Sequence, residues 1–309
     1  MFFILSGYIL SYNYKEFNSK INIKDFYINR IARIYPVYFI YGLIGFPFFL
    51  ASVGSINSIL DLEIIQVVLA VIVFIFMLQA WFPQLFNIWN FGGSWSLSVE
   101  AFFYLLFPFI RYITNTLSNR NLKIVFVLSF LLSSIPVLYL YAFSNEVVFS
   151  ILNTSLYSNP IFRIGEFIMG IILFMLSQER KIINFNKTLF VILMIFFIIL
   201  VDNLNLSSLS VLNFIFVPIV CLIILNLHNS NMYLLSNKIL VYLGKISYSF
   251  YLAQFFVFAL IKSEIHSFNV EMIYKWLLAF VITLSISIIF YHLIENPSKL
   301  FIKSILKRK

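Results

Sequence analysis

The sequence predicts an all-α, polytopic integral membrane protein: a single domain over residues 1–309 with about nine membrane-spanning helices. Hydrophobic residues make up 62% of the chain and charged residues only 11%, whereas a soluble domain carries roughly 25% charged residues. The sequence also holds 38 Phe and 18 Tyr, which suits lipid-facing helices with aromatic belts at the membrane surfaces. This composition excludes a large soluble core.

Apolar segments follow one another along the whole chain, with no soluble-type linker or low-complexity stretch between them. A bilayer crossing needs about 20 mostly apolar residues, so each long segment is a candidate span. These segments cover residues 2–13, 35–51, 64–82, 94–110, 124–141, 161–176, 189–201, 211–227, 246–261 and 273–293.

The distribution of Lys and Arg predicts the orientation. Most of the 21 basic residues lie in regions 14–33, 111–123, 178–187 and 228–245 and in the tail after residue 298, whereas loops 144–160, 202–210 and 263–272 hold none. Cytoplasmic loops carry the excess of Lys and Arg. We therefore expect the basic regions and the C-terminus in the cytoplasm, and residue 1 outside.

The region between Arg33 and Arg111 creates a parity problem. It contains no Lys or Arg but includes three apolar segments, 35–51, 64–82 and 94–110. Two cytoplasmic ends require an even number of crossings, so one segment should be re-entrant, broken or interfacial. Such backbone is tolerated only where protein or a water-filled cavity surrounds it. We hypothesise that this region shapes the active cavity; the sequence does not show which segment fails to cross.

Several function classes are disfavoured. The net charge of +9 comes from short loops between apolar segments, so it reports topology and does not predict nucleic-acid binding. The single cysteine, Cys221, lies in an apolar run and is expected to pack as a small apolar residue. No phosphate-binding loop, metal-spaced His or Cys cluster, or Gly-x-Ser-x-Gly elbow is found in the sequence, and no metal is expected.

Charged residues inside apolar segments are the first candidates for chemistry, because each costs roughly 2.5–3.5 kcal/mol on insertion scales. Glu100 stands at the head of an apolar helix, and we favour a functional role over a carboxylate held at a membrane boundary. Arg163 and Glu166 are spaced i, i+3 and can pair on one helix face, which favours a structural ion pair. Glu295 follows the last segment and is best interpreted as a helix-end anchor.

Arg30 and Arg33 precede the second apolar segment. Any cytoplasmic loop carries such residues, so for either arginine taken alone an ordinary loop position is the favoured interpretation. If the stretch is helical, both side chains point the same way and form a bidentate phosphate clamp. His292 is a lone histidine at a predicted helix end, and a structural role is favoured for it.

Six short motifs resemble, in order, those of acyltransferase family 3, the membrane O-acetyltransferases of bacterial surface polysaccharides. They are Phe2-Phe3-Ile4-Leu5-Ser6-Gly7-Tyr8, Arg30-x-x-Arg33-Ile34-Tyr35-Pro36, Trp95-Ser96-Leu97-Ser98-Val99-Glu100 with Phe103-Tyr104 and Pro108, Arg163-x-x-Glu166-Phe167-x-x-Gly170, Leu243-Gly244-x-x-Ser247-Tyr248-x-x-Tyr251-Leu252 and Ile294-Glu295-x-Pro297.

The resemblance implies a helical fold, normally of ten helices, in the bacterial cytoplasmic membrane. It implies transfer of an acyl group, usually acetyl, from acetyl-CoA or another acyl-CoA to a hydroxyl of a polysaccharide or lipid-linked glycan. No bound cofactor is implied. The family's first helix carries an Arg and a His, and this sequence begins after both; Gln254 stands where many members have His.

The same resemblance assigns roles to residues. Arg30 and Arg33 would bind the donor phosphates at the cytoplasmic entrance, and Glu100 would act as the catalytic carboxylate. Supporting positions are Ser6, Trp95, Ser98, Arg163, Glu166, Tyr248 and Glu295. The pairs Ser6-Gly7 and Ser247-Tyr248 are expected to let helices approach closely, because small residues allow it.

Two rival functions stay open. A transporter or flippase for a lipid-linked glycan also needs many helices and intramembrane charges, although no internal repeat of the kind common in transporters is found. An inactive truncated remnant that only assembles with other membrane proteins is the second alternative. Dependence on acyl-CoA separates an acyltransferase from a transporter, and an in-frame upstream helix bearing Arg and His would weaken the remnant interpretation.

Overall fold

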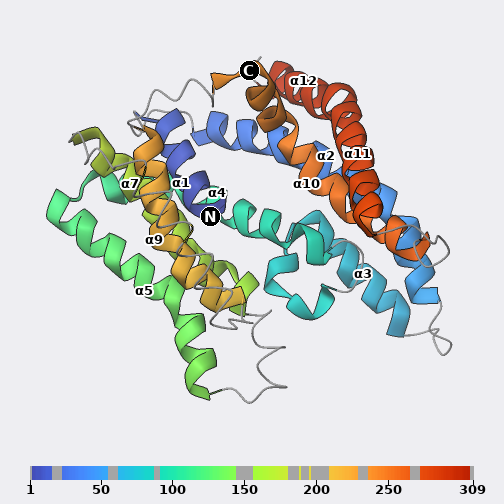
Figure 1. Ribbon diagram of the computed structural model, residues 1–309, viewed down its shortest axis with the longest axis horizontal. Coiled ribbons are helices and arrows are strands. Elements are labelled where there is room, and N and C mark those ends of the chain that lie inside the picture. The colour runs from blue at the N-terminus through green and yellow to red at the C-terminus, as the bar shows by residue number, and fades with distance from the viewer. Residues whose placement is uncertain are drawn as a thin grey trace. The chain divides into compact units, whose positions relative to one another are not determined.

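The computed structural model describes residues 2–15, 23–54, 62–86, 91–143, 156–179, 188, 195, 209–228, 236–264 and 272–306. Its regular structure is helical, and these ranges contain no strand. Contacts divide the chain into two units. The first comprises Met1–Ile21 and Ser98–Met232, and the second comprises Asn22–Leu97 and Tyr233–Lys309. The helices of each unit can be followed by colour in Figure 1.

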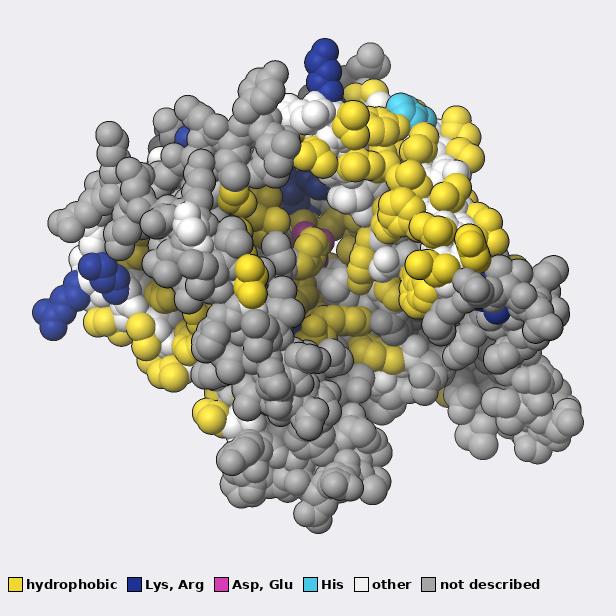
Figure 2. Space-filling view, in the orientation of Figure 1, with side chains coloured by type: hydrophobic (Ala, Val, Ile, Leu, Met, Phe, Trp, Pro, Cys, Tyr) yellow, Lys and Arg dark blue, Asp and Glu magenta, His cyan; other side chains and the backbone are white. Residues whose placement is uncertain are grey.

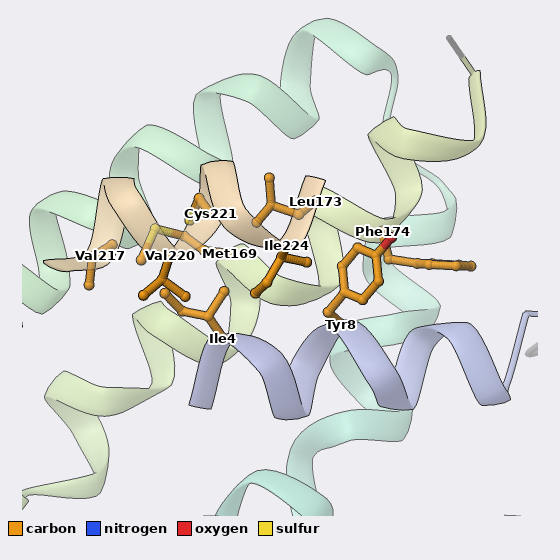
Figure 3. Packing of buried hydrophobic residues seen from close by; sticks show 9 residues of the cluster. All are labelled: Ile4, Tyr8, Met169, Leu173, Phe174, Val217, Val220, Cys221 and Ile224. Carbon is orange, nitrogen blue, oxygen red and sulfur yellow. The ribbon is translucent and has the colours of Figure 1, made fainter. Parts of the chain in front are cut away.

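The first unit is built around α7 (Pro160–Glu179), which packs against α1 (Phe2–Asn13), α5 (Asn119–Phe143) and α9 (Leu209–His228). Its core is apolar, as Figure 3 shows: side chains from α1, α7 and α9 converge there. Tyr8 and Phe174 meet edge to face with ring centroids 5.7 Å apart. The cluster comprises Ile4, Tyr8, Met169, Leu173, Phe174, Val217, Val220, Cys221 and Ile224. Cys221 is therefore a packing residue, as its apolar surroundings predicted.

Backbone contact between α1 and α7 depends on a pair of glycines. A β-carbon on Gly7 would overlap the backbone carbonyl oxygen of Phe167, and one on Gly170 would overlap the carbonyl oxygen of Ile4. Small residues let transmembrane helices approach this closely. The close-packing prediction for Ser6-Gly7 is confirmed at Gly7.

Arg111 holds the ends of α1 and α4 (Phe91–Asn115) together in the first unit. Its guanidinium donates to Asn115 Oδ1 at 2.6 Å and to the Lys15 carbonyl at 3.3 Å, and it lies 6.0 Å from the ring centre of Phe174. The sequence placed Arg111 in a loop beginning at residue 111. That boundary was wrong: the helix continues to Asn115, and Arg111 is buried. Its charge suits these positions, because helix C-termini favour cations.

The second unit pairs α10 (Lys238–Glu264) with α11 (Met272–Phe290), and α2 (Ile23–Gly54) with α12 (Asn296–Leu306). A π-helical turn, Tyr291–Glu295, joins α11 to α12. Tyr41 of α2 stacks on Phe290 with ring centroids 4.4 Å apart. The unit also includes α3 (Leu62–Ile75) and the 3-10 turns η1 (Gln79–Trp81) and η2 (Pro83–Leu85).

Four stretches of the described chain are long and apolar enough to cross a membrane: Gly93–Asn115, Asn119–Tyr139, Leu156–Gln178 and Ile273–Ile305. On α11 the apolar side chains point outward, with Ile273 63% and Trp276 58% exposed. Figure 2 shows hydrophobic side chains gathered over the helices that Figure 1 draws in orange and red. Such a surface suits lipid contact. The all-α membrane fold is confirmed, and the nine crossings stay a prediction.

Several segment boundaries differ from the predicted ones. The helix containing segment 35–51 begins at Ile23, so Arg30 and Arg33 lie on a helix and not in a loop. The helix in segment 64–82 ends at Ile75. The tail after residue 298 was not predicted to be helical, but its residues 299–306 belong to α12. Segment 189–201 lies outside the described residues except for residue 195.

Candidate active site

Glu100 lies on the α4 part of the first unit and is only 7% exposed. Its Oε1 accepts a hydrogen bond from Ser6 Oγ on α1 at 3.3 Å and another from the Tyr104 hydroxyl one turn along α4. Two hydroxyl groups thus fix the orientation of the carboxylate. Ser6, predicted as a supporting residue, directly contacts Glu100.

Aromatic side chains beside Glu100 make its surroundings apolar. Phe103 stacks on Phe167 of α7 with ring centroids 4.7 Å apart, and the ring of Phe3 meets Phe103 edge to face at 5.3 Å. Ser98 is buried on the same helix. In such surroundings a carboxylate interacts more strongly with a partner than it does in water. A carboxylate held this way can accept a proton from a bound hydroxyl.

Arg163 and Glu166 form the predicted ion pair on α7, with Arg163 Nη1 2.5 Å from Glu166 Oε1. Both side chains are buried. Arg163 also donates from Nε to the Tyr157 carbonyl at 2.5 Å and lies 4.0 Å from the centre of the Tyr157 ring. Because Glu166 is already bound to a cation, the structure favours a structural role for this pair.

The second unit contains the residues predicted to bind the donor. Arg30 and Arg33 are three residues apart on α2, so the helical condition for a phosphate clamp is met. Arg33 is exposed, whereas Arg30 is half-buried with its guanidinium carbon 5.8 Å from the Phe26 ring centre. The exposed Arg33 is thus the more accessible cation.

Glu295 is buried within the second unit and does more than end a helix. Its Oε2 accepts a hydrogen bond from Ser249 Oγ of α10 at 2.6 Å, and the charges of Arg33 and Lys299 act on its carboxylate. The Tyr41 hydroxyl donates to the backbone carbonyl of Ser249 at 3.3 Å. The interpretation of Glu295 as an anchor is thereby extended: it joins the π-helical turn to α10 beside a predicted donor-binding arginine.

The motif Ser247-Tyr248 behaves differently from the close-packing prediction. Tyr248 donates from its hydroxyl to the Ile34 carbonyl of α2 at 2.8 Å, so it does join two helices. Ser247 is exposed and donates to Gly244 of its own helix, and a β-carbon on Gly244 would meet nothing within 4 Å. The prediction was therefore wrong for Ser247.

The predicted site residues fall into two groups. Ser6, Ser98, Glu100, Arg163 and Glu166 belong to the first unit, and Arg30, Arg33, Trp95, Tyr248 and Glu295 to the second. Sequence reasoning missed two partners, Tyr104 and Ser249. Tyr104 was detectable, because it stands four residues after Glu100 on one helix face. Ser249 was not, because it lies 46 residues from Glu295 in the chain.

Residues 1–292 match the family model described as an acyltransferase domain. The chain belongs to acyltransferase family 3. No group of three or more His, Cys, Asp or Glu among the described residues is arranged to hold a metal ion. The family assignment agrees with a buried carboxylate held on membrane helices.

Curated relatives of this acyltransferase-family chain include proteins named "Putative O-acetyltransferase" from Staphylococcus aureus strains COL, MSSA476 and MRSA252. Each is 25% identical to the chain over 328 aligned positions, covering 96% of the chain and 51% of the relative. The chain thus spans about half the length of the curated relatives it matches. No solved structure matches it significantly.

Proposed function

We propose that this chain is a membrane O-acyltransferase that moves an acyl group, acetyl in the first instance, from acyl-CoA to a hydroxyl of a cell-surface polysaccharide or its lipid-linked precursor. The observation that carries the proposal is Glu100: a carboxylate buried in an apolar helical unit and held by two hydroxyl groups. Family membership and the relatives' names support the reaction type.

The reaction needs a base near the acceptor. The acceptor oxygen attacks the thioester carbonyl, a carbon–oxygen bond forms, and the carbon–sulfur bond breaks. The hydroxyl proton passes to the base, and the CoA sulfur leaves as a thiolate that is later protonated. A sugar hydroxyl is a weak nucleophile at neutral pH, and a positioned base typically contributes 10²–10⁴-fold.

Glu100 is the best base in the described chain. Glu166 is bound to Arg163. His292 is exposed, and its Nε2 pairs with the Tyr242 hydroxyl at 3.0 Å. The Glu100 carboxylate accepts hydrogen bonds from the hydroxyls of Ser6 and Tyr104, which orient it. It accepts the proton itself or orients another base that does.

We place the donor phosphates at Arg33, with Arg30 beside it. An exposed guanidinium on a helix suits a phosphate, which it binds in bidentate fashion. The positive-inside pattern puts this end of α2 in the cytoplasm, where acyl-CoA is found. We propose that the protein lies in the bacterial cytoplasmic membrane with its C-terminus inside, and that the acceptor lies at or beyond the outer face.

Membrane vesicles containing the chain test this function. We expect labelled acetyl to pass from acetyl-CoA to the host's surface polysaccharide, and the Glu100→Gln variant to lose about 10²-fold or more of that rate. Arg33→Ala should raise the KM for acetyl-CoA. The exposed Ser285, whose hydroxyl bonds only to its own helix at Val281 in the described contacts, provides a matched control as Ser285→Ala.

Transfer at the wild-type rate by both Glu100→Gln and Arg33→Ala would overturn the assigned roles. Transport of a lipid-linked glycan by the vesicles without any need for acyl-CoA would favour the flippase alternative. Absence of all acyl transfer by wild-type vesicles would contradict the proposed function itself.

A further inference from the structure

The helical stretch that ends in α12 is too long for one membrane crossing. The apolar stretch Ile273–Ile305 has 33 residues, which corresponds to about 50 Å of helix. A hydrocarbon core is about 30 Å thick, and even a tilt of about 40°, the upper end of the observed range, does not fit the whole stretch into it. The π-helical turn Tyr291–Glu295 interrupts the α-helix, and Figure 1 shows the chain bending where α11 passes into α12. Part of this stretch therefore lies outside the hydrocarbon core.

The basic residues identify α12 as that part. α11 carries a single charged residue, Lys275, in 19 residues, whereas the 11 residues of α12 include Lys299 and Lys303. Residues 296–309 hold five Lys or Arg and no Asp or Glu. Because charged side chains are costly within the apolar layer, α12 is better placed at the membrane surface than in the core.

The outward side of α12 is nevertheless apolar. Leu300, Phe301 and Ile305 are 60%, 64% and 50% exposed, and they lie within an arc of about 140° on the helix. On the other side of the helix Ile302 is half-buried, and α12 packs against α2. Packing against α2 thus holds α12 with an apolar face turned away from the unit.

Lys299 and Lys303 border this apolar face. They lie one turn apart beside Leu300, and both are half-buried. The charge of Lys299 acts on the buried Glu295, which Ser249 Oγ ties to α10 at 2.6 Å. Lysine side chains in such positions lay their stems along apolar surface and keep the ammonium in the polar phase. α12 therefore combines an apolar face with a basic edge.

We propose that α12 is an in-plane helix at the cytoplasmic membrane surface that binds the headgroups of anionic phospholipids. Its apolar face enters the boundary between headgroups and acyl chains, and its lysines reach the lipid phosphates. Basic amphipathic helices bind membranes in this way, through buried apolar area together with attraction to anionic lipid. Charge selects this ligand, and the positive-inside pattern selects the side. The inference does not depend on the proposed function.

Fluorescence quenching in nanodiscs tests the lipid preference. The full chain with Cys221→Ser and Ile305→Cys is labelled with bimane and reconstituted with equal amounts of phosphatidylcholine and phosphatidylglycerol. Two preparations differ only in which lipid carries bromine, a quencher, on its acyl chains. We expect quenching to be about twofold stronger or more with brominated phosphatidylglycerol, because each basic residue near the surface favours anionic lipid. High salt should weaken this preference, since it screens the charges.

Two further proteins separate charge from simple lipid contact. A bimane at Val281, which is 56% exposed on α11, should be quenched nearly equally by both lipids. Replacing Lys303, Lys307, Arg308 and Lys309 together by Gln should abolish the preference at residue 305 and leave the total quenching there unchanged, because the apolar face is intact. Lys299 is kept in this variant, since its charge acts on Glu295.

Three results would overturn the proposal. Equal quenching by both lipids at residue 305, or a preference that survives replacement of the basic residues, would show that α12 does not recognise anionic headgroups. Absence of quenching by either lipid would show that α12 does not lie at the membrane. Loss of the preference on addition of CoA would assign the lysines to the phosphates of the acyl donor and not to lipid.

Discussion

Among individual residues, the buried carboxylates differ in the contacts that the structure describes for them. Glu166 has an arginine at 2.5 Å, whereas the described contacts of Glu100 are with the hydroxyls of Ser6 and Tyr104. A carboxylate paired with a buried cation holds that cation in place, which supports a structural role for Glu166. The catalytic role of Glu100 is the proposal made above, and its two hydroxyl contacts give the carboxylate a defined orientation.

The structural assignment of the Arg163–Glu166 pair predicts a distinct stability pattern. Glu166→Leu leaves a buried arginine without its partner, which typically costs about 3–5 kcal/mol. The double variant Arg163→Met with Glu166→Leu should lose much less, because no uncompensated charge remains. Thermal unfolding of the detergent-solubilised protein measures both. A double variant no more stable than Glu166→Leu would contradict this assignment.

The contacts of a residue can be predicted from the sequence where both partners lie on one helix. Arg163 with Glu166 followed from spacing alone, and Tyr104 with Glu100 was open to the same argument. Bonds between distant segments, such as Ser249 to Glu295, could not be predicted because composition and periodicity do not show which helices are neighbours. The role of Arg111 was missed for a local reason: a charged residue was taken to end the apolar segment.

Among helices, α1 and α7 approach each other so closely that the backbone of each occupies the space a side chain would need on Gly7 and Gly170. Gly7→Ala or Gly170→Ala would push a methyl group into a carbonyl oxygen of the facing helix. We expect each to destabilise the protein by about 1–3 kcal/mol, the usual cost of overpacking. Gly244→Ala is the control: it meets nothing within 4 Å and should gain up to about 1 kcal/mol from helix propensity. Thermal unfolding measures all three, and equal stability of Gly7→Ala and Gly244→Ala would contradict the contact.

Helices were predicted more reliably in their cores than at their ends. Apolar content identified the middle of α2, α4 and α11. The polar first turns of α2 and the basic α12 were assigned to loops, because a hydropathy criterion stops where a helix leaves the apolar layer although its backbone hydrogen bonds continue. With 19 residues, α11 alone is about 29 Å long, close to the thickness of a hydrocarbon core of about 30 Å.

At the scale of the whole molecule, the parity argument makes a direct prediction about sidedness. If the short α3 and the backbone after it enter and leave the membrane on the same side, Arg33 and Arg111 share the cytoplasmic side. Cysteines placed at the exposed Lys24, Arg120 and Ser304 should then be labelled by an impermeant maleimide only in inside-out vesicles. A cysteine at Asn153, in the loop without basic residues, should be labelled only in right-side-out vesicles.

Cys221→Ser gives the background for this labelling, since Cys221 is the single cysteine and is 6% exposed. Labelling of the Lys24 and Arg120 cysteines from opposite sides would contradict the re-entrant interpretation.

Fold class and family were predictable at this scale because apolar content and ordered motifs are global signals. The two-unit division was not, because it depends on contacts between segments far apart in the chain.

The absence of side chains at Gly7 and Gly170, where α1 meets α7, also affects how the two helices attract each other. With no side chain between them, the Cα hydrogens of Gly7 and Gly170 face the carbonyl oxygens of Phe167 and Ile4, the arrangement of paired Cα–H···O contacts. Such contacts are worth about 0.5–1 kcal/mol each and do not require water to be expelled. Attraction of this kind persists in a lipid solvent, where apolar side chains gain nothing by leaving one hydrocarbon neighbour for another.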